Sequence, residues 1–432
     1  MLSTATRPEE DTRQPLREVP VSRLEFWLFG VTLFIFAVGL PTRWGYDAGG
    51  PNPLLTAAQL LFPALCLLPT IGAFRSWQRV IILALPALVY SGLALASTLW
   101  SGAPVETATA GLVLVVATAF AANLALRLPP SRLLRLLFLV GIATLIVNLA
   151  FVVALPSLGT APNTGSFNGV FNNKNPLGRH AVVHILLALF AWRSRVASFP
   201  VAAITILGYA FLLIGSQSMT SIVALAGTLA SVAIFATFRA RRTLPGVVIG
   251  TTLALGTLSL GYATANLGLI TEYLGKDITL TGRTDIWTNV IPIGLERPLL
   301  GWGFDAVFVG YFGPLHEAYI AAGWDASHAH NALIQSFMEL GFVGLAVYLW
   351  IYWVGFVRGI AVARGSTGAI GLLPLGFVTY TVLTSITEIG PQSSNYVWIV
   401  LVYLVTTSGV TADRAAPRAR LEGPRDSSLL AV

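Results

Sequence analysis

Two histidines, His328 and His330, stand just before a long apolar segment in a 432-residue chain that has only five histidines. Asn331 follows them and is a typical N-cap of a helix. The start of a helix offers free N–H groups and partial positive charge, which suit anions and disfavour a protonated imidazole. A neutral imidazole can accept a proton from a reacting hydroxyl. The stretch therefore predicts a catalytic or substrate-binding site, with a structural pair of histidines as the alternative.

A metal site is the competing interpretation of this His-x-His pattern. Zinc requires three or four ligands, and the nearby candidates are His316, Glu317 and Asp325. The sequence has no HExxH pattern, and its one cysteine, Cys66, lies inside an apolar run. We therefore expect no metal ion and no cofactor.

A second group of polar side chains lies in FNNKNPLGRH, residues 171–180, where another apolar run begins. Pro176 suits the first turn of a helix, which places Lys174 and Asn175 at the helix start. Arg179 falls inside the apolar run, where ionisable groups usually have a pairing or functional reason. The stretch predicts a polar site, with a solvated turn as the alternative. The short polar turn GSQSMTS, residues 215–221, gives a weaker signal of the same kind.

The segment TGRTDIWTNVIPIGLERPLLGWGFDAV, residues 281–307, predicts a short amphipathic helix on the membrane surface. Asp285 would lie favourably in its first turn, and Arg283 near the boundary of water and lipid. Pro298 and the glycines after it end the helix, and Arg297 stands at this break. An interfacial helix with a snorkelling arginine is the alternative to a functional role. The apolar face would consist of Trp287, Val290, Ile291 and Gly294.

The composition requires a membrane to hold these segments. Hydrophobic residues make up 55% of the chain and charged residues 10%, and the mean hydropathy is +0.75. A soluble domain carries about 25% charged residues. We predict one all-α polytopic membrane domain over residues 1–432, in which the first apolar run serves as an uncleaved membrane helix.

Twelve apolar segments are long enough to cross a bilayer as helices. They lie near residues 24–40, 54–74, 79–98, 108–126, 134–156, 177–192, 200–215, 219–238, 245–265, 331–357, 367–387 and 395–411.

The basic residues orient these spans. With the N-terminus inside, 20 of the 26 lysines and arginines fall on the cytoplasmic side, as the positive-inside rule requires. The tails 1–23 and 412–432 are then cytoplasmic, and residues 266–330 form a large outer loop between the ninth and tenth spans. The basic pI of about 9.7 is thus a sign of topology, and we expect no nucleic-acid binding.

The outer face has cations and a possible base but lacks a P-loop, a GxSxG motif and a DxD motif. A reaction there without ATP needs a substrate that carries its own activation. A sugar linked to a lipid diphosphate is such a substrate, because fixed cations can stabilise the charge of its leaving group.

Four stretches, namely GRTDIW, ERPLLGWGFDAV, HAHNALIQSFMELGFVG and FNNKNPLG, resemble signature blocks of the bacterial O-antigen ligase and polymerase superfamily. The resemblance covers about residues 165–360. It implies a GT-C-type, metal-independent, inverting glycosyltransferase of the bacterial inner membrane. Its substrate would be a glycan on undecaprenyl diphosphate, bound at the periplasmic face.

The resemblance also implies roles for residues. His330 would be the catalytic base, and Arg283, from the GR-x-x-x-W pattern, would contact the diphosphate or glycan. The family turn often carries arginine where this chain has Met219, which weakens a phosphate role for that turn. The expected substrate contacts are Lys174, Asn175, Arg179, Asp285, Trp287, Arg297, His328 and Asn331.

Two reactions fit this resemblance. A polymerase would join exopolysaccharide or O-antigen repeats, as the forms of FNNKNPLG and SQSMTS favour, whereas a ligase would transfer finished glycan to lipid A-core. Polysaccharide assembly and chain-length proteins are the expected partners of either enzyme, besides membrane lipid. A glycan transporter, for which Glu339 and His184 are the ionisable groups inside spans, and an outer-loop receptor or scaffold are the alternatives that are not enzymes.

Overall fold

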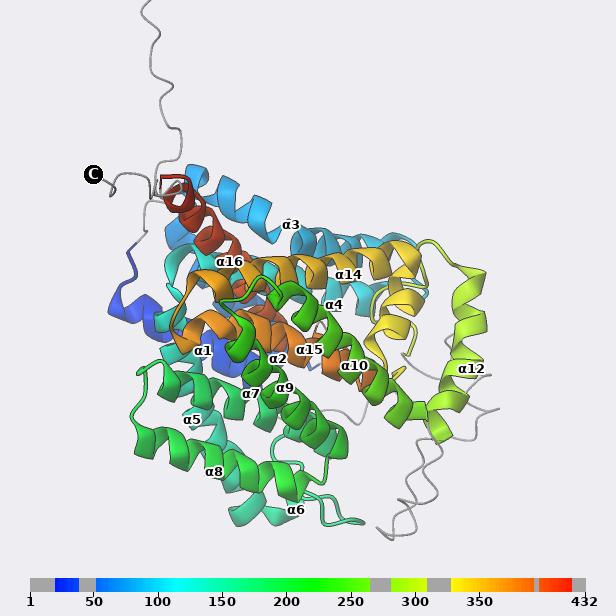
Figure 1. Ribbon diagram of the computed structural model, residues 1–432. Coiled ribbons are helices and arrows are strands. Elements are labelled where there is room, and N and C mark those ends of the chain that lie inside the picture. The colour runs from blue at the N-terminus through cyan, green and yellow to red at the C-terminus, as the bar shows by residue number, and fades with distance from the viewer. Residues whose placement is uncertain (1–19, 39–51, 265–280, 309–327, 392–395, 422–432) are drawn as a thin grey trace, which may run out of the picture.

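The computed structural model describes residues 20–38, 52–264, 281–308, 328–391 and 396–421 (Figure 1). Within these residues the regular secondary structure is helical, apart from one isolated bridge between Thr160 and Phe167. The first half contains α1 (Arg23–Val38), α2 (Pro53–Leu67), η2 (Leu68–Thr70), α3 (Phe74–Ala96), η3 (Ser97–Leu99), α4 (Pro104–Arg127), α5 (Pro130–Ala154), α6 (Pro156–Gly159) and α7 (Lys174–Arg193). The second half contains α8 (Phe199–Ser216), α9 (Met219–Phe238), α10 (Leu244–Thr264), α12 (Thr281–Glu296), α14 (Ala332–Gly365), η4 (Ala369–Leu372), α15 (Leu373–Thr387) and α16 (Tyr396–Leu421).

Eight helical segments among the described residues are long and apolar enough to cross a membrane. They are Pro53–Thr70, Ser76–Leu99, Pro104–Arg127, Pro130–Ala154, Phe199–Ser216, Met219–Phe238, Ala332–Gly365 and Ala369–Thr387, and the helices Leu244–Leu258 and Tyr396–Val410 are apolar but shorter. Large apolar side chains such as Ile82, Ile204 and Trp353 are 66–68% exposed on the outside of this bundle, where lipid would cover them. The all-α polytopic fold is confirmed. Each of the twelve predicted segments coincides with a helix, while twelve crossings remain a prediction.

Helix α15 is the central element of the bundle. The apolar window that contains it is 78% buried, against 17% for the window of α2. It packs against α9, α10, α14 and α16, and Figure 1 shows it enclosed by these neighbours. Several of its buried hydroxyls donate to its own backbone, as where Thr379 donates to the carbonyl of Leu375 at 2.9 Å. Helix α15 ends at Thr387, and the next residue, Glu388, is buried inside the bundle.

Helix α14 is kinked at Gly341, whose φ of +64° lies in the left-handed region. A kink removes helical hydrogen bonds, and inside a membrane the freed groups must find other partners. The segment after α12 supplies them. The amide of Phe342 donates to the carbonyl of Pro298 at 2.8 Å, and that of Gly303 donates to the carbonyl of Glu339 at 2.9 Å. The kink and this segment therefore stabilise one another.

We expect Gly341→Ala to destabilise the protein strongly. Backbone with a φ of +64° and a ψ of −164° is essentially restricted to glycine and costs another residue of order 1–3 kcal/mol. A Cβ here would also overlap the backbone of Leu299. The measurement is the thermal unfolding midpoint of the purified protein in detergent. Gly246→Ala is the matched control, because a Cβ at Gly246 has no neighbour within 4 Å. An equal midpoint for the two variants would contradict this account of the kink.

The predicted amphipathic helix forms as α12, and its apolar side packs against α14. Ile286 is 3% exposed and Val290 1%, and they contact Phe337 and Met338 of α14. Ile291, assigned from the sequence to the apolar face, is 38% exposed, so the buried stripe is rotated from the predicted one. The cause is that α12 packs on another helix through Ile286, Val290 and Gly294.

Candidate active site

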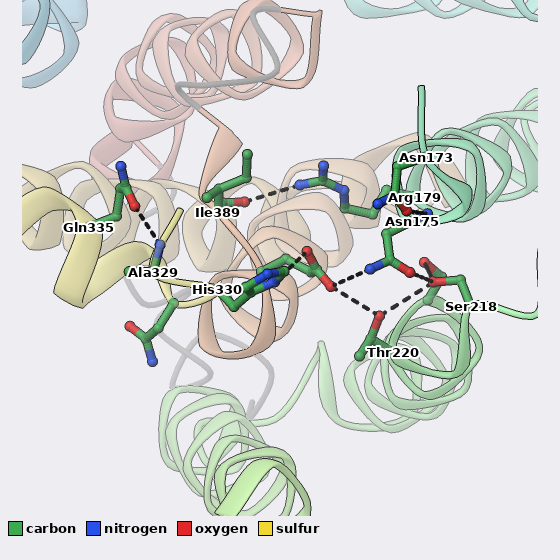
Figure 2. A network of polar contacts seen from close by, with 12 residues as sticks. Asn173, Asn175, Arg179, Ser218, Thr220, Ala329, His330, Gln335 and Ile389 are labelled. Atoms are coloured by element: carbon green, nitrogen blue, oxygen red, sulfur yellow. Dashed lines mark hydrogen bonds and ion pairs between the residues drawn. The ribbon is translucent and has the colours of Figure 1, made fainter. Parts of the chain in front are cut away.

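Glu388 is the centre of a polar network built from four distant parts of the chain. Its carboxylate is buried, and one oxygen, Oε1, accepts hydrogen bonds from Asn175 Nδ2 and Thr220 Oγ1, each at 3.4 Å. The other oxygen, Oε2, lies 3.7 Å from Nδ1 of His330. Figure 2 draws these contacts as dashed lines from the labelled Asn175, Thr220 and His330 to one unlabelled carboxylate between them. The network thus joins the starts of α7 and α9, the loop before α14 and the end of α15.

Three helices begin beside this carboxylate. Asn173 caps α7 by accepting the amide of Asn175 at 3.0 Å, and Asn331 caps α14 by accepting the amides of Leu333 and Ile334 at 2.9 and 3.1 Å. Helix α9 begins at Met219, next to Thr220. The partial positive charge of helix N-termini offsets the cost of burying Glu388. The same arrangement favours an anionic ligand next to the network.

Both the oxygen and the nitrogen of the Asn175 side-chain amide make hydrogen bonds. Ser218 donates a hydrogen bond to Asn175 Oδ1 at 3.2 Å, while Nδ2 of Asn175 faces Glu388. The close approach of α7 and α9 that allows this contact depends on Gly178, because a Cβ there would overlap Ser218 and Ser221. Asn175 therefore presents a fixed donor to the carboxylate.

The loop that carries His330 is pinned on several sides. The amide of Ala329 donates to Gln335 Oε1 at 2.9 Å (Figure 2). The carbonyl of Ala329 accepts the indole N–H of Trp287 at 2.8 Å. Asn331 donates to the carbonyl of Ile386 in α15 at 3.2 Å. His330 itself has a φ of +48°, which is uncommon for a residue other than glycine. Strained backbone of this kind persists where the surroundings fix it, and it is concentrated at functional sites.

Gln335 is oriented by Glu339, one turn further along α14. Its Nε2 donates to Glu339 Oε1 at 2.7 Å, which leaves Oε1 of Gln335 for Ala329. The other ionisable residue of the transporter hypothesis, His184, is buried between the rings of Tyr209 and Tyr396, with ring centroids 5.1 and 5.5 Å away. Both groups thus have packing or positioning contacts. The contact of Glu339 is with Gln335, whose side chain also bonds Ala329 in the histidine loop.

The position of His330 suits a proton acceptor. Its side chain is 17% exposed, and Nδ1 is a buried atom without a hydrogen-bond partner at the present distance from Glu388. Catalytic hydrogen bonds are often long before substrate binds. A proton on Nδ1 would face the carboxylate, which leaves a lone pair on Nε2. This is the arrangement in which a carboxylate fixes the tautomer of a histidine base.

His328 lies against His330, with ring centroids 4.0 Å apart and a 42° angle between the planes. Together with Glu388 the two histidines offer three ligand atoms, all within 4.8 Å of one another. The ligand candidates considered from sequence, His316, Glu317 and Asp325, lie outside the described residues. Within the described residues, Glu388 is the third side chain that could bind a metal ion beside the two histidines.

The cations predicted in the FNNKNPLGRH stretch lie at the start of α7. Lys174 is its first residue and is half-buried next to Asn175. Arg179 donates to the carbonyl of Ile389 at 3.2 Å, directly after Glu388, and its own carbonyl accepts the hydroxyl of Tyr380 at 3.1 Å. Arg179 therefore lies beside the network, as Figure 2 shows.

The remaining predicted residues are placed differently. Trp287 contacts the histidine loop through its indole N–H. Arg283 lies in the first turn of α12, whereas Asp285, predicted to lie there, is the fifth residue because the helix already begins at Thr281; the side chains of both are outside the described residues. The described contacts of Arg297 lie away from the histidines: its guanidinium is 4.0 Å from the ring centroid of Trp302 and donates to the carbonyl of Trp100 at 3.2 Å. A substrate role for these three charged residues remains a prediction.

Comparison with known proteins places this site in a family context. Residues 202–349 match the family model described as O-antigen ligase. That range runs from α8 into α14 and includes Thr220, Trp287, His328 and His330. Residues 202–349 are thus similar to the O-antigen ligase family. Asn175, at the start of α7, lies outside the matched range. Glu388, directly after α15, also lies outside it.

The chain is also similar to a curated protein. The chain is 30% identical over 209 residues to the exopolysaccharide production protein ExoQ of Rhizobium meliloti. The match covers 45% of this chain and 46% of that protein, so the similarity spans about half the length of each. The chain is thus an integral membrane protein with a region similar to the O-antigen ligase family.

Glu388, Ser218 and Thr220 were not among the site residues predicted from the sequence. Ser218 and Thr220 lie in the GSQSMTS turn, whose polar character was visible but weak as a signal. Glu388 had a clearer signal, because it is an acidic residue at the end of the apolar segment 367–387. An ionisable group at that position usually has a partner.

Proposed function

We propose that this protein is a glycosyltransferase that moves a glycan from undecaprenyl diphosphate to an acceptor hydroxyl. The observation that carries the proposal is the His330–Glu388 pair, which lies among three helix N-termini and includes a residue of the region similar to the O-antigen ligase family. A base beside an anion-binding environment is what such a transfer needs.

In the proposed reaction the acceptor oxygen attacks the anomeric carbon of the donor sugar. Its proton passes to Nε2 of His330, while Glu388 holds the Nδ1 proton and stabilises the imidazolium that forms. The bond between the anomeric carbon and the diphosphate oxygen breaks, and undecaprenyl diphosphate leaves with the bonding electrons. A single displacement of this kind inverts the configuration of the sugar. Because the imidazole activates the acceptor, we expect transfer in the absence of metal.

The leaving diphosphate develops negative charge, and the groups around the network can stabilise it. Lys174 and Arg179 lie in the first turns of α7, and the N-terminus of this helix adds partial positive charge. Arg283 is the proposed third cation, at the start of α12. His328, Asn331, Trp287 and Asp285 are the proposed contacts to the glycan.

The proposed setting is the bacterial inner membrane, with both termini cytoplasmic and the site on the periplasmic side. The distribution of lysine and arginine supports this orientation. It would make residues 266–330 a periplasmic loop. The resemblance to O-antigen ligases and polymerases implies that the fold is of the GT-C type, and we propose that one membrane domain forms it. Lipid-linked glycan then reaches the site from the bilayer, and assembly and chain-length proteins are the proposed partners.

We favour a polymerase of repeat units over a ligase, because the matched relative is named an exopolysaccharide production protein. The test is analysis of lipid-linked intermediates and polysaccharide in a deletion strain. Single repeats that accumulate on the carrier would support the polymerase. Long chains that remain on the carrier would support the ligase that transfers to lipid A-core. Normal polysaccharide in the deletion strain would overturn both.

Arg283→Ala is expected to lower the rate of glycan transfer by about 10²–10³-fold, the usual effect of removing one donor to transition-state charge. Arg283→Lys should retain a fraction of the activity, because lysine keeps the charge but loses the planar fork. The measurement is the transfer rate of the purified protein. Arg242→Ala is the control, since Arg242 is exposed near the predicted cytoplasmic end of α10. Equal rates for Arg283→Ala and the control would remove Arg283 from the site.

A further inference from the structure

We propose that His328, His330 and Glu388 also form a binding site for a divalent transition-metal ion such as Zn²⁺, and that this ion reversibly inhibits transfer. Two imidazoles and one carboxylate are a known zinc-binding set that leaves a fourth position open. Metal binding stands on the geometry alone, whereas the inhibitory consequence rests on the proposed function.

The spacing of the ligand atoms is close to what zinc requires. Zinc binds nitrogen and oxygen at about 2.0–2.2 Å, so tetrahedral ligands lie roughly 3.4 Å apart. Nδ1 of His330 and Oε2 of Glu388 are 3.7 Å apart, and all three ligand atoms lie within 4.8 Å of one another. His328 is partly exposed, and its ring would have to move closer to the other two ligands for tetrahedral binding.

The surroundings of the three side chains have the features of a metal site. Zinc sites usually hold their carboxylate ligands through hydrogen bonds from neighbouring residues. Here Asn175 and Thr220 donate to Oε1 of Glu388, which leaves Oε2 directed at His330. Nδ1 of His330 is buried and has no hydrogen-bond partner. The two imidazoles favour a transition metal over Mg²⁺, which prefers oxygen ligands.

Inhibition follows from the tautomer of His330. In the metal-free protein the proton on Nδ1 faces Glu388, and the lone pair on Nε2 is available to the acceptor. A metal ion bound to Nδ1 displaces the proton from Nδ1 and uses the lone pair of that nitrogen. The neutral imidazole must then carry its proton on Nε2. His330 then cannot accept the proton of the attacking hydroxyl. The ion also engages Glu388, which otherwise stabilises the imidazolium.

The direct test is titration of the purified full-length protein, treated with EDTA and then freed of it, with Co²⁺ as a spectroscopic substitute for Zn²⁺. We expect one Co²⁺ per chain, with visible absorption that Zn²⁺ abolishes. His328→Ala and the isosteric Glu388→Gln should each weaken binding at least about tenfold, and Thr220→Val by about 10- to 100-fold, the range for a residue that orients a ligand. Each variant must elute as a monodisperse protein.

His316→Ala serves as the matched histidine control and should bind Co²⁺ like the wild type. Absence of binding by the wild type would overturn the proposed site. So would unchanged binding by both His328→Ala and Glu388→Gln, or loss of binding in His316→Ala with retention in His328→Ala.

A transfer assay then separates the metal site from the enzyme activity. We expect transfer in EDTA, inhibition by added Zn²⁺ and recovery when excess EDTA is restored. Undiminished transfer with the site saturated by Zn²⁺ would overturn the inhibition. Cobalt binding through these side chains in a protein that transfers nothing under either condition would preserve the metal site but count against the proposed function.

Discussion

Replacing His330 with alanine is expected to lower the rate of glycan transfer by about 10²–10⁴-fold, the usual contribution of a general base. The side chain is the imidazole that Glu388 faces, in a loop fixed by Gln335, Trp287 and Asn331. The loop contacts are made by the neighbours of His330, so the variant should insert and fold. The measurement is the transfer rate of the purified protein, together with the polymer length in a complemented deletion strain.

His330→Asn separates the base from the contact with Glu388. The amide of asparagine places a donor near the position of Nδ1, so it can face the carboxylate, but it has no group at the position of Nε2. We expect it to be as inactive as the alanine variant. Full-length polymer in a strain that carries either variant would show that His330 is not the base.

The local parts of this site could be predicted from the sequence because they depend on short-range rules. The N-cap role of Asn331 follows from its place before an apolar run, and the structure confirms it. The start of α7 follows from Pro176, which suits a first helical turn, and α12 forms within the segment predicted as a short helix. The apolar segments likewise appear as helices, because length and composition determine what can cross a bilayer.

The long-range parts could not be predicted. Asn175 and Glu388 are 213 residues apart in the chain, and no periodic pattern links them. Their contact depends on the packing of α7, α9 and α15. Arg297 illustrates the same limit: its charge was visible in the sequence, but its stacking on Trp302 depends on how the segment after α12 folds back.

Substitution of Glu388 with glutamine tests the part of the site that the sequence did not identify. We expect transfer to fall by up to about 10⁴-fold, the cost measured when the carboxylate partner of a histidine base becomes an amide. An amide can donate to Nδ1 of His330, which favours the tautomer with the proton on Nε2, and it cannot stabilise the imidazolium. The hydrogen bonds from Asn175 and Thr220 need only the retained oxygen, so the packing should survive.

The form of the loss distinguishes a positioning residue from a purely structural one. A carboxylate that sets the tautomer of the base acts in the chemical step, so kcat should fall while KM for the lipid-linked glycan changes little. Glu388→Asp should recover part of kcat, because it keeps the charge on a shorter side chain. Glu296→Gln, an exposed glutamate at the end of α12, is the matched control and should transfer like the wild type. Loss of the folded protein in Glu388→Gln, or a rise in KM alone, would mean that Glu388 supports the fold or binds substrate and does not orient His330.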